Sequence, residues 1–267
     1  MSNEARRVSF FGAQGDALAA RLDLPVGKPR GYALFAHCFT CSKDIGAARK
    51  IADGLAAQGF AVMRFDFTGL GHSEGEFANT TFASNIEDLV AAADWMREEG
   101  MVPTVLIGHS LGGAAVLSAA AHIPEVKGVA AMGAPADPGH VVHNFGADLE
   151  AIKRDGEAEV SLAGRRFRIR KSFIDDLETH DLEARIANLK CDLLIFHSPL
   201  DMTVGIENAS RIFAAAKHPK SFVSLDKADH LLTGSEDGRF VASIIAAWAG
   251  RLIPEEAPAG VTFQLQH

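Results

Sequence analysis

The chain is 267 residues long, with 48% hydrophobic and 22% charged residues. This composition is typical of a globular protein and too apolar for a disordered one. The formal net charge is −8, and the 26 basic residues are scattered along the chain, so the sequence lacks the basic patch of a nucleic-acid-binding protein. We therefore expect no nucleic-acid partner.

The cysteines and the apolar segments indicate the compartment. Cys38, Cys41 and Cys191 form no disulfide framework, and an odd number is typical of a reducing environment. The N-terminal MSNEARRVSF has no apolar segment of the kind that signal peptides contain. Residues 100–124 carry no Asp, Glu, Lys or Arg, but their four glycines and two prolines suit a membrane-spanning helix poorly. The sequence predicts a cytoplasmic protein with no membrane partner.

Short apolar runs alternate with helix-like segments along most of the chain. Two runs between residues 6 and 25 flank the turn-rich GAQGD and predict a β-hairpin. Strands are predicted at 32–38, 61–67, 104–108, 126–134, 192–198 and 221–225, and helices at 43–58, 84–99, 110–122, 206–217 and 239–250. Ser42 is the expected N-cap of the first helix. This alternation predicts an α/β fold with a mainly parallel sheet, helices on both faces, and ligands beyond the carboxyl ends of the strands.

The alternation is interrupted at about residues 139–190. This polar segment contains helix-like stretches and the hairpin-like EVSLAGRRFRIR. An insertion of this length after a strand predicts a cap over the site, with a surface excursion as the alternative. Residues 1–253 are then one domain with an inserted cap, and residues 254–267 form a C-terminal tail or linker.

The pattern Gly-x-Ser-x-Gly occurs twice, around Ser73 and around Ser110. A nucleophile elbow requires a strand that runs directly into a tight turn and then a helix. Ser110 lies between the apolar TVLIG and the helix-like LGGAAVLSAAAHI, whereas Ser73 lies in a glycine-rich loop with no helix after it. The sequence therefore predicts Ser110 as a nucleophile.

A serine nucleophile needs a histidine base and an acid that orients this base. Asp201 follows the strand predicted at 192–198, and His230 follows the strand at 221–225. The resulting chain order Ser, Asp, His is the one that accompanies this type of elbow. Asp226 and Asp229 are weaker candidates for the acid, because they follow the wrong strand or lie too close to the base.

The tetrahedral intermediate of acyl transfer needs two backbone N–H groups that form an oxyanion hole. We expect one from Leu111, which follows the nucleophile, and the other from Phe39, in the loop after the strand at 32–38. This chemistry requires no cofactor and no metal. The pair His140 and His143 has no carboxylate or cysteine pattern beside it, so surface histidines are expected there.

Several motifs resemble those of a known superfamily. GHSLGG, FDFTGLGHSEG, HSPLD and KADH resemble the α/β-hydrolases, and FAHCFTCSKDI and IGHSLGGAAVL resemble, more narrowly, the hydrolase domain of bacterial bifunctional α/β-hydrolase/OsmC-family proteins. The resemblance implies an α/β-hydrolase fold and a serine carboxylic-ester hydrolase, with an OsmC-like domain or a second copy of the chain as candidate partners. The chain departs from the superfamily where His37-Cys38 replaces the usual His-Gly.

Two other functions fit parts of the sequence. Cys38 and Cys41 form a CxxC between a strand and a helix, which is also the position of thioredoxin-like redox motifs, so redox chemistry or redox modulation of a hydrolase is one alternative. A ligand-binding or scaffold domain without catalysis is the other. TGLGHSEG is close to a dinucleotide fingerprint, but Glu74 occupies the position of its third glycine.

The prediction is therefore a serine hydrolase that cleaves esters, and by the same chemistry thioesters, through an acyl-enzyme. Apolar residues of the predicted cap either line a pocket for an acyl or alcohol group of modest size or hold the cap together. These residues are Phe145, Phe167, Phe173 and Leu177.

Overall fold

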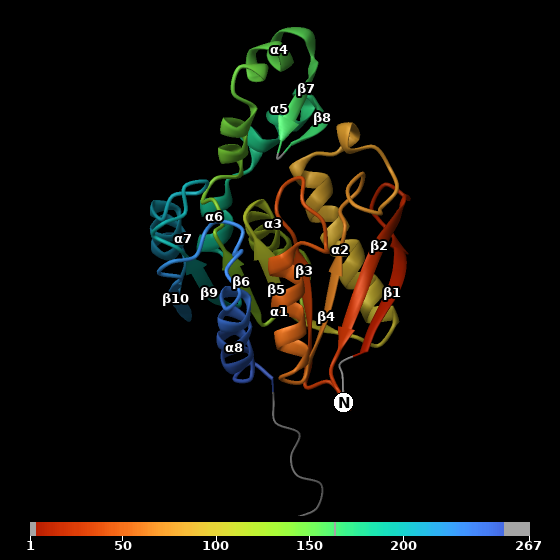
Figure 1. Cartoon of the computed structure of the whole chain (residues 1–267), viewed down its shortest axis with the longest axis vertical. Coiled ribbons are helices and arrows are strands. Elements are labelled where there is room, and N and C mark those ends of the chain that lie inside the picture. Colours follow the sequence, from red (N-terminus) through yellow and green to blue (C-terminus); the bar gives the residue numbers. More distant parts are fainter. Residues whose placement is uncertain (1–3, 163, 254–267) are drawn as a thin grey trace, which may run out of the picture.

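A computed structural model of the chain describes residues 4–162 and 164–253. Within these residues, eight strands form one sheet in the order β1-β2-β4-β3-β5-β6-β9-β10 (Figure 1). The strands β1 (Glu4–Phe11) and β2 (Ala17–Leu24) form the predicted antiparallel hairpin, and β2 is antiparallel to β4 (Phe60–Phe65). From β4 to β10 all neighbouring strands are parallel. The predicted α/β fold is confirmed.

The remaining elements follow the predicted alternation of strand and helix. The other strands of the sheet are β3 (Gly31–Ala36), β5 (Pro103–His109), β6 (Gly128–Met132), β9 (Asp192–His197) and β10 (Lys220–Ser224). The helices beside the sheet are α1 (Gly46–Ala56), α2 (Phe82–Glu98), α3 (Leu111–Ala119), α7 (Glu207–Ala215) and α8 (Asp237–Ala249).

Both faces of the sheet are covered. In β3, Leu34 and Ala36 join the hydrophobic core that includes α2 and α3, whereas Ala33 and Phe35 join the core that includes α1 and α8. Successive side chains of a strand point to opposite faces, so a strand buried on both sides must be apolar throughout. This is why the parallel strands were recognisable as unbroken apolar runs.

Each of the five helices beside the sheet begins one to three residues from its predicted start, and the side-chain contacts explain two of these differences. Helix α1 begins after Ile45, and Ser42 is not its N-cap. The backbone N–H and the ammonium group of Lys43 each bind the carboxylate of Asp66 at 2.6 Å, which keeps Lys43 in the preceding loop. Helix α2 begins at Phe82, where Thr81 and Ser84 form a capping box that stabilises the N-terminal turn.

The segment between β6 and β9 extends beyond the carboxyl edge of the sheet, at the top of Figure 1. It contains η3 (Pro138–Phe145), α4 (Asp148–Asp155), the hairpin of β7 (Glu157–Leu162) and β8 (Arg165–Arg170), α5 (Lys171–Thr179) and α6 (Leu182–Ala187). The ring of Phe173 stacks on Phe39, and Arg165 donates a hydrogen bond to the carbonyl of Thr40. The segment therefore covers the loop that follows β3.

No helix among the described residues is both long and apolar enough to cross a bilayer. The uncharged residues 100–124 instead form β5, α3 and a short 3₁₀ turn. The tail predicted for residues 254–267 lies outside the described part of the chain.

Candidate active site

Ser110 occupies a sharp turn between β5 and α3. Its backbone has φ 57° and ψ −126°, a strained conformation for a residue with a side chain. A Cβ on Gly108 would collide with the carbonyl oxygen of Gly112, and a Cβ on Gly112 would collide with the carbonyl oxygen of His37. The glycines on both sides of Ser110 therefore allow strand, helix and the β3 loop to approach one another. This is the geometry of a nucleophile elbow.

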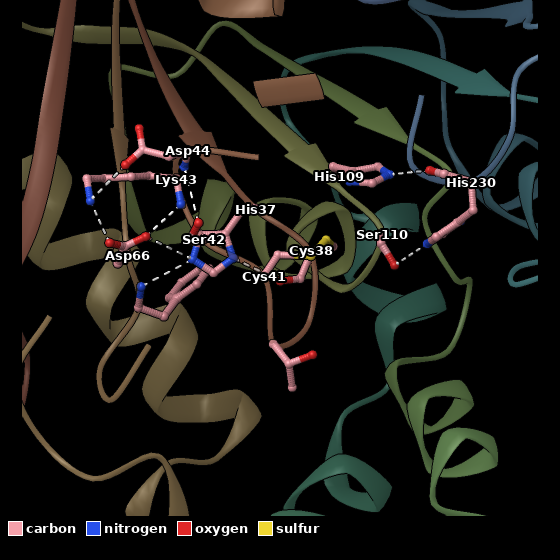
Figure 2. Close-up of a disulfide and its surroundings, with 12 residues drawn as sticks. His37, Cys38, Cys41, Ser42, Lys43, Asp44, Asp66, His109, Ser110 and His230 are labelled. Atoms are coloured by element: carbon pink, nitrogen blue, oxygen red, sulfur yellow. Dashed lines mark hydrogen bonds and ion pairs between the residues drawn. A yellow bond between two sulfur atoms is a disulfide. The ribbon is translucent and has the colours of Figure 1, made fainter. Parts of the chain in front are cut away.

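Ser110, His230 and Asp201 lie in one chain of hydrogen bonds. Oγ of Ser110 is 2.9 Å from Nε2 of His230, as Figure 2 shows, and Nδ1 of His230 is 2.7 Å from Oδ2 of Asp201. Because an ionised carboxylate only accepts hydrogen bonds, Nδ1 is the protonated nitrogen of the neutral ring. Nε2 is then the acceptor for the hydroxyl proton of Ser110.

Asp201 is held in its ionised form. Burial acts to raise the pKa of its carboxyl group, but hydrogen bonds from His230 and from the backbone N–H groups of Val204 and Thr203 outweigh burial and lower this pKa. Gly133 lies beside the pair with φ 51°, and an added Cβ would come within 3.3 Å of Asp201 and 3.4 Å of His230. The ionised acid therefore fixes the orientation of the imidazole from a closely packed position.

Two backbone N–H groups beside the elbow have no hydrogen-bond partner among the described residues. Leu111 is the first residue of α3, and the first N–H groups of a helix have no acceptor within the helix. No backbone hydrogen bond among the described residues uses the N–H of Phe39. Both residues line a narrow cavity, together with the apolar side chains of Phe67, Leu70 and Phe77. Both N–H groups thus belong to residues at one cavity beside Ser110.

Known proteins that resemble the chain share this architecture. The chain matches the family described as serine aminopeptidase, S33, over residues 27–154. The solved esterase domain of a Rhodothermus marinus protein is 51% identical to it, over 94% of this chain and 100% of the esterase domain, with a TM-score of 0.78. The chain belongs to the α/β-hydrolase family.

Further relatives of this α/β-hydrolase are more distant. The mouse palmitoyl-protein thioesterase ABHD10, mitochondrial, is 31% identical over 187 residues, which are 67% of this chain and 62% of the mouse protein. The chain thus spans about three fifths of the length of that curated relative. Est1E from Butyrivibrio proteoclasticus, solved with ferulic acid bound, has the same fold with a TM-score of 0.81 at 21% identity, over 93% of this chain and 100% of Est1E.

The hydrolase contains a disulfide between Cys38 and Cys41, whose Cα atoms are 5.3 Å apart (Figure 2). The cysteine count predicted no disulfide framework and did not identify this single bond, although the CxxC pattern left oxidation of the pair open as an alternative. Cys191 is the free cysteine of the described chain. The count missed the bond because it says nothing about which cysteines a turn brings together. Cys38, which replaces the usual glycine after His37, is one half of a covalent bond within the β3 loop.

Three buried histidines at the ends of parallel strands were not assigned a role from the sequence. They are His37 after β3, His109 at the end of β5 and His197 at the end of β9. The side chain of His37 hydrogen-bonds a main-chain carbonyl in the loop after β3 at 2.8 Å. The side chain of His109 does so in the loop after β10 at 2.6 Å, and that of His197 in the loop after β9 at 2.8 Å. Each of these loops carries one residue of the predicted site. The signal in the sequence was the recurrence of histidine at the carboxyl end of apolar runs.

Other residues weighed in the sequence have different surroundings. The hydroxyl of Ser73 donates to the carbonyl of Asp66 at 2.5 Å and accepts from the N–H of Ala19 at 2.9 Å, and among the described residues it has no hydrogen bond to a histidine. Asp226 accepts from Ser224, and Asp229 from Thr233. Neither is hydrogen-bonded to His230 among the described residues. The described chain also contains no cluster of three or more His, Cys, Asp or Glu side chains suited to a metal ion.

The cap residues expected to line a pocket pack against the loops that follow β3 and β4. Phe145 and Phe173 contact the ring of Phe39, and Phe167 contacts Phe77 edge to face. Leu177 is buried in the same hydrophobic core. Of the two alternatives, these contacts favour the role of holding the cap on the domain.

Proposed function

We propose that this chain is a serine hydrolase that cleaves carboxylic esters of short to medium acyl chain. Ser110, His230 and Asp201 would be its catalytic triad. The observation that carries the proposal is the pair of hydrogen bonds, 2.9 and 2.7 Å long, that joins a serine in a strained elbow to an ionised acid through one imidazole. The relatives named as an esterase and a thioesterase support the same reaction class.

In the proposed mechanism, Oγ of Ser110 attacks the acyl carbon while Nε2 of His230 takes the hydroxyl proton. Asp201 stays ionised and stabilises the imidazolium. The N–H groups of Leu111 and Phe39 stabilise the oxyanion of the tetrahedral intermediate. His230 then protonates the leaving alcohol, and a water molecule activated by the same ring hydrolyses the acyl-enzyme. No cofactor takes part.

The surroundings of the proposed oxyanion hole support a small apolar acyl group. The cavity at Phe39 and Leu111 is narrow, and five of its eleven lining residues are phenylalanine or leucine. A thioester passes through the same tetrahedral intermediate, and the mouse relative is named as a thioesterase. The test is to measure kcat/KM on p-nitrophenyl esters of graded chain length and on matched acyl thioesters. Absence of turnover on both series would contradict the proposal.

The two serines of the repeated motif provide a matched pair of variants. Ser110→Ala removes the nucleophile and should lower kcat on p-nitrophenyl esters by about 10⁶-fold while the fold is retained. Ser73→Ala removes a loop hydrogen bond and should leave kcat within about tenfold of the parent. A serine-directed fluorophosphonate should label the parent and Ser73→Ala but not Ser110→Ala. The opposite pattern would contradict the assignment of the elbow.

We further propose the finer features implied by the sequence resemblance. Residues 1–253 would be the hydrolase domain with a cap at about 139–190, and an OsmC-like domain or a second copy of the chain would be its partner. A cytoplasmic location is part of the same proposal. Light scattering on the purified chain, alone and mixed with an OsmC-like protein, tests the partners. A strictly monomeric chain that binds no such protein would contradict them.

A further inference from the structure

The Cys38–Cys41 disulfide spans the residue that supplies the second oxyanion-hole N–H in the proposed mechanism. Cys38 and Cys41 are the first and last residues of a turn, and the N–H of Cys41 donates to the carbonyl of Cys38 at 3.1 Å. Phe39 and Thr40 are the two central residues of this turn. The direction of the Phe39 N–H therefore depends on the conformation that the disulfide encloses.

Thr40 shows that the turn is held under strain. Its φ is 57°, in the left-handed region that glycine and asparagine favour and that a β-branched residue rarely enters. Such a residue remains there only where the surrounding structure holds it. A bond between the two ends of the turn is a direct means of holding it. Without this bond, a negative φ at Thr40 would relieve the strain, and the two ends of the turn that contains Phe39 could move apart.

The turn and the rest of the loop are also anchored by non-covalent contacts. Before the turn, His37 hydrogen-bonds the carbonyl of Cys38, and after it Lys43 binds the buried carboxylate of Asp66 (Figure 2). The ring of Phe39 stacks on Phe173 of the cap. Arg165 of the cap also donates a hydrogen bond to the carbonyl of Thr40. These hydrogen bonds act on single carbonyls of the turn, and the disulfide adds a covalent restraint between its two ends.

The disulfide closes a ring of only four residues. In the chain-entropy account, a disulfide stabilises a protein less as the loop it closes becomes shorter. Its main effect here is therefore local. Cys38 is buried, with 4% of its surface exposed, whereas Cys41 is half-buried and is the more exposed residue of the pair.

We propose that the Cys38–Cys41 disulfide is a positioning element, which holds the Phe39 N–H in the oxyanion hole and makes the oxidised form the more active ester hydrolase. The inference rests on the proposed function. Reduction by a dithiol begins when one thiolate of the dithiol attacks Sγ of Cys41 and Cys38 leaves as a thiolate, which takes up a proton. The second thiol of the reductant then displaces Cys41. Two electrons and two protons pass to the protein, and the reductant becomes a disulfide.

The first experiment compares kcat and KM of the oxidised chain with those of the chain reduced by dithiothreitol and desalted without oxygen. Complete loss of one oxyanion-hole donor lowers kcat by about 10²–10³-fold. Reduction only makes the position of the Phe39 N–H less well defined, so kcat should fall by at least about tenfold. KM should change little, because the donor acts on the transition state. Reoxidation should restore kcat. Titration of two additional thiols confirms that the bond was reduced.

Cys191→Ser is the matched control, because it removes the free cysteine and leaves the turn intact. It should respond to dithiothreitol as the parent does. Circular dichroism of the reduced chain measures whether the fold persists. An unchanged kcat after full reduction would overturn the inference, and so would global unfolding on reduction, which would make the bond a general stabiliser.

A second variant separates strain in the turn from the presence of the bond. Glycine adopts a positive φ at little cost. Thr40→Gly should therefore keep the conformation of the turn after reduction. The decrease in its kcat on reduction should be several-fold smaller than the decrease in the parent. An equal or larger loss would overturn the argument from Thr40. Fluorophosphonate labelling of the oxidised chain distinguishes a failure of the proposed function from a failure of this inference. An oxidised chain that is neither labelled nor active contradicts the proposed ester hydrolase. An oxidised chain that is active, and whose kcat does not change on reduction, contradicts only the role of the disulfide.

Discussion

At the scale of single residues, the site depends on buried histidines that hold other groups in place. His109 is 1% exposed, and its Nε2–H donates to the main-chain carbonyl of His230 at 2.6 Å. Burial, with His230 nearby, lowers the pKa of His109 to about 4. The ring therefore stays neutral at every pH at which an ester hydrolase with a neutral base would work. It fixes the backbone of His230 without competing for protons.

The lowered pKa of His109 predicts a pH-dependent stability. Between pH 6.5 and about 4 the unfolded chain binds a proton at this residue and the folded chain does not. The free energy of unfolding should thus fall as the pH drops through this window, by an amount on the order of 3 kcal/mol, and should not fall further below it on account of His109. Denaturant unfolding at several pH values, for the parent and for His109→Gln, measures the difference. The same slope in both would contradict the prediction, as would an NMR titration of His109 near pH 6.5.

At the scale of elements, the site is built where helix α3 meets the end of β5 and the loop after β3. Ser110 can adopt its conformation only because Gly112 lets the carbonyl of His37 approach the first turn of the helix. The same approach brings the β3 loop, and with it Phe39, beside Leu111. The geometry of the proposed oxyanion hole is therefore set by the contact between elements rather than by either residue alone.

Two helical glycines test this contact. Gly112→Ala places a methyl group against two main-chain carbonyls and should lower the free energy of unfolding by about 1–3 kcal/mol and reduce kcat. Gly46→Ala, in the first turn of α1, meets no atom within 4 Å and should raise stability by about 0.5–1 kcal/mol. Urea unfolding and p-nitrophenyl ester kinetics measure both effects. Equal stability of the two variants would show that the packing at Gly112 is not tight.

At the scale of the whole molecule, buried charges join parts of the chain that are distant in sequence. Arg64 in β4 is 1% exposed and binds Asp23 of β2 at 2.6 Å, and it also hydrogen-bonds Asp44 in the loop before α1 at 3.1 Å. Replacing one partner of a buried ion pair leaves the other charge without compensation, which costs more than the pair itself contributes. This pair therefore ties the hairpin to the loop that leads into α1.

Arg64→Met should accordingly lower the free energy of unfolding by about 3 kcal/mol, because the cationic partner that Asp23 keeps within the described part of the chain is the partly exposed Arg21. Arg154→Met, which breaks a fully exposed pair with Asp155, is the control and should leave stability unchanged. Chemical unfolding of both variants provides the measurement. A loss of the same size in the two would contradict the role of burial.

Much of the fold could be predicted, because short stretches of sequence indicate the individual strands and helices. Unbroken apolar runs indicate strands buried on both faces, and a strand followed at once by Gly-x-Ser-x-Gly and a helix indicates the elbow. The start of α1 was wrong because Asp66, 23 residues away, holds Lys43 in the loop. The disulfide and the positioning histidines were missed because a residue type alone does not reveal its partner.

The sequence by itself determined the order of the elements, the elbow at Ser110 and the chain order of the three predicted catalytic residues. Only the tertiary structure decided that His230 reaches Ser110 across 120 residues and Asp201 across 29. The reason is physical: periodicity and turn residues act over a few neighbours, whereas the distance between side chains on separate loops is set by how the strands pair and pack.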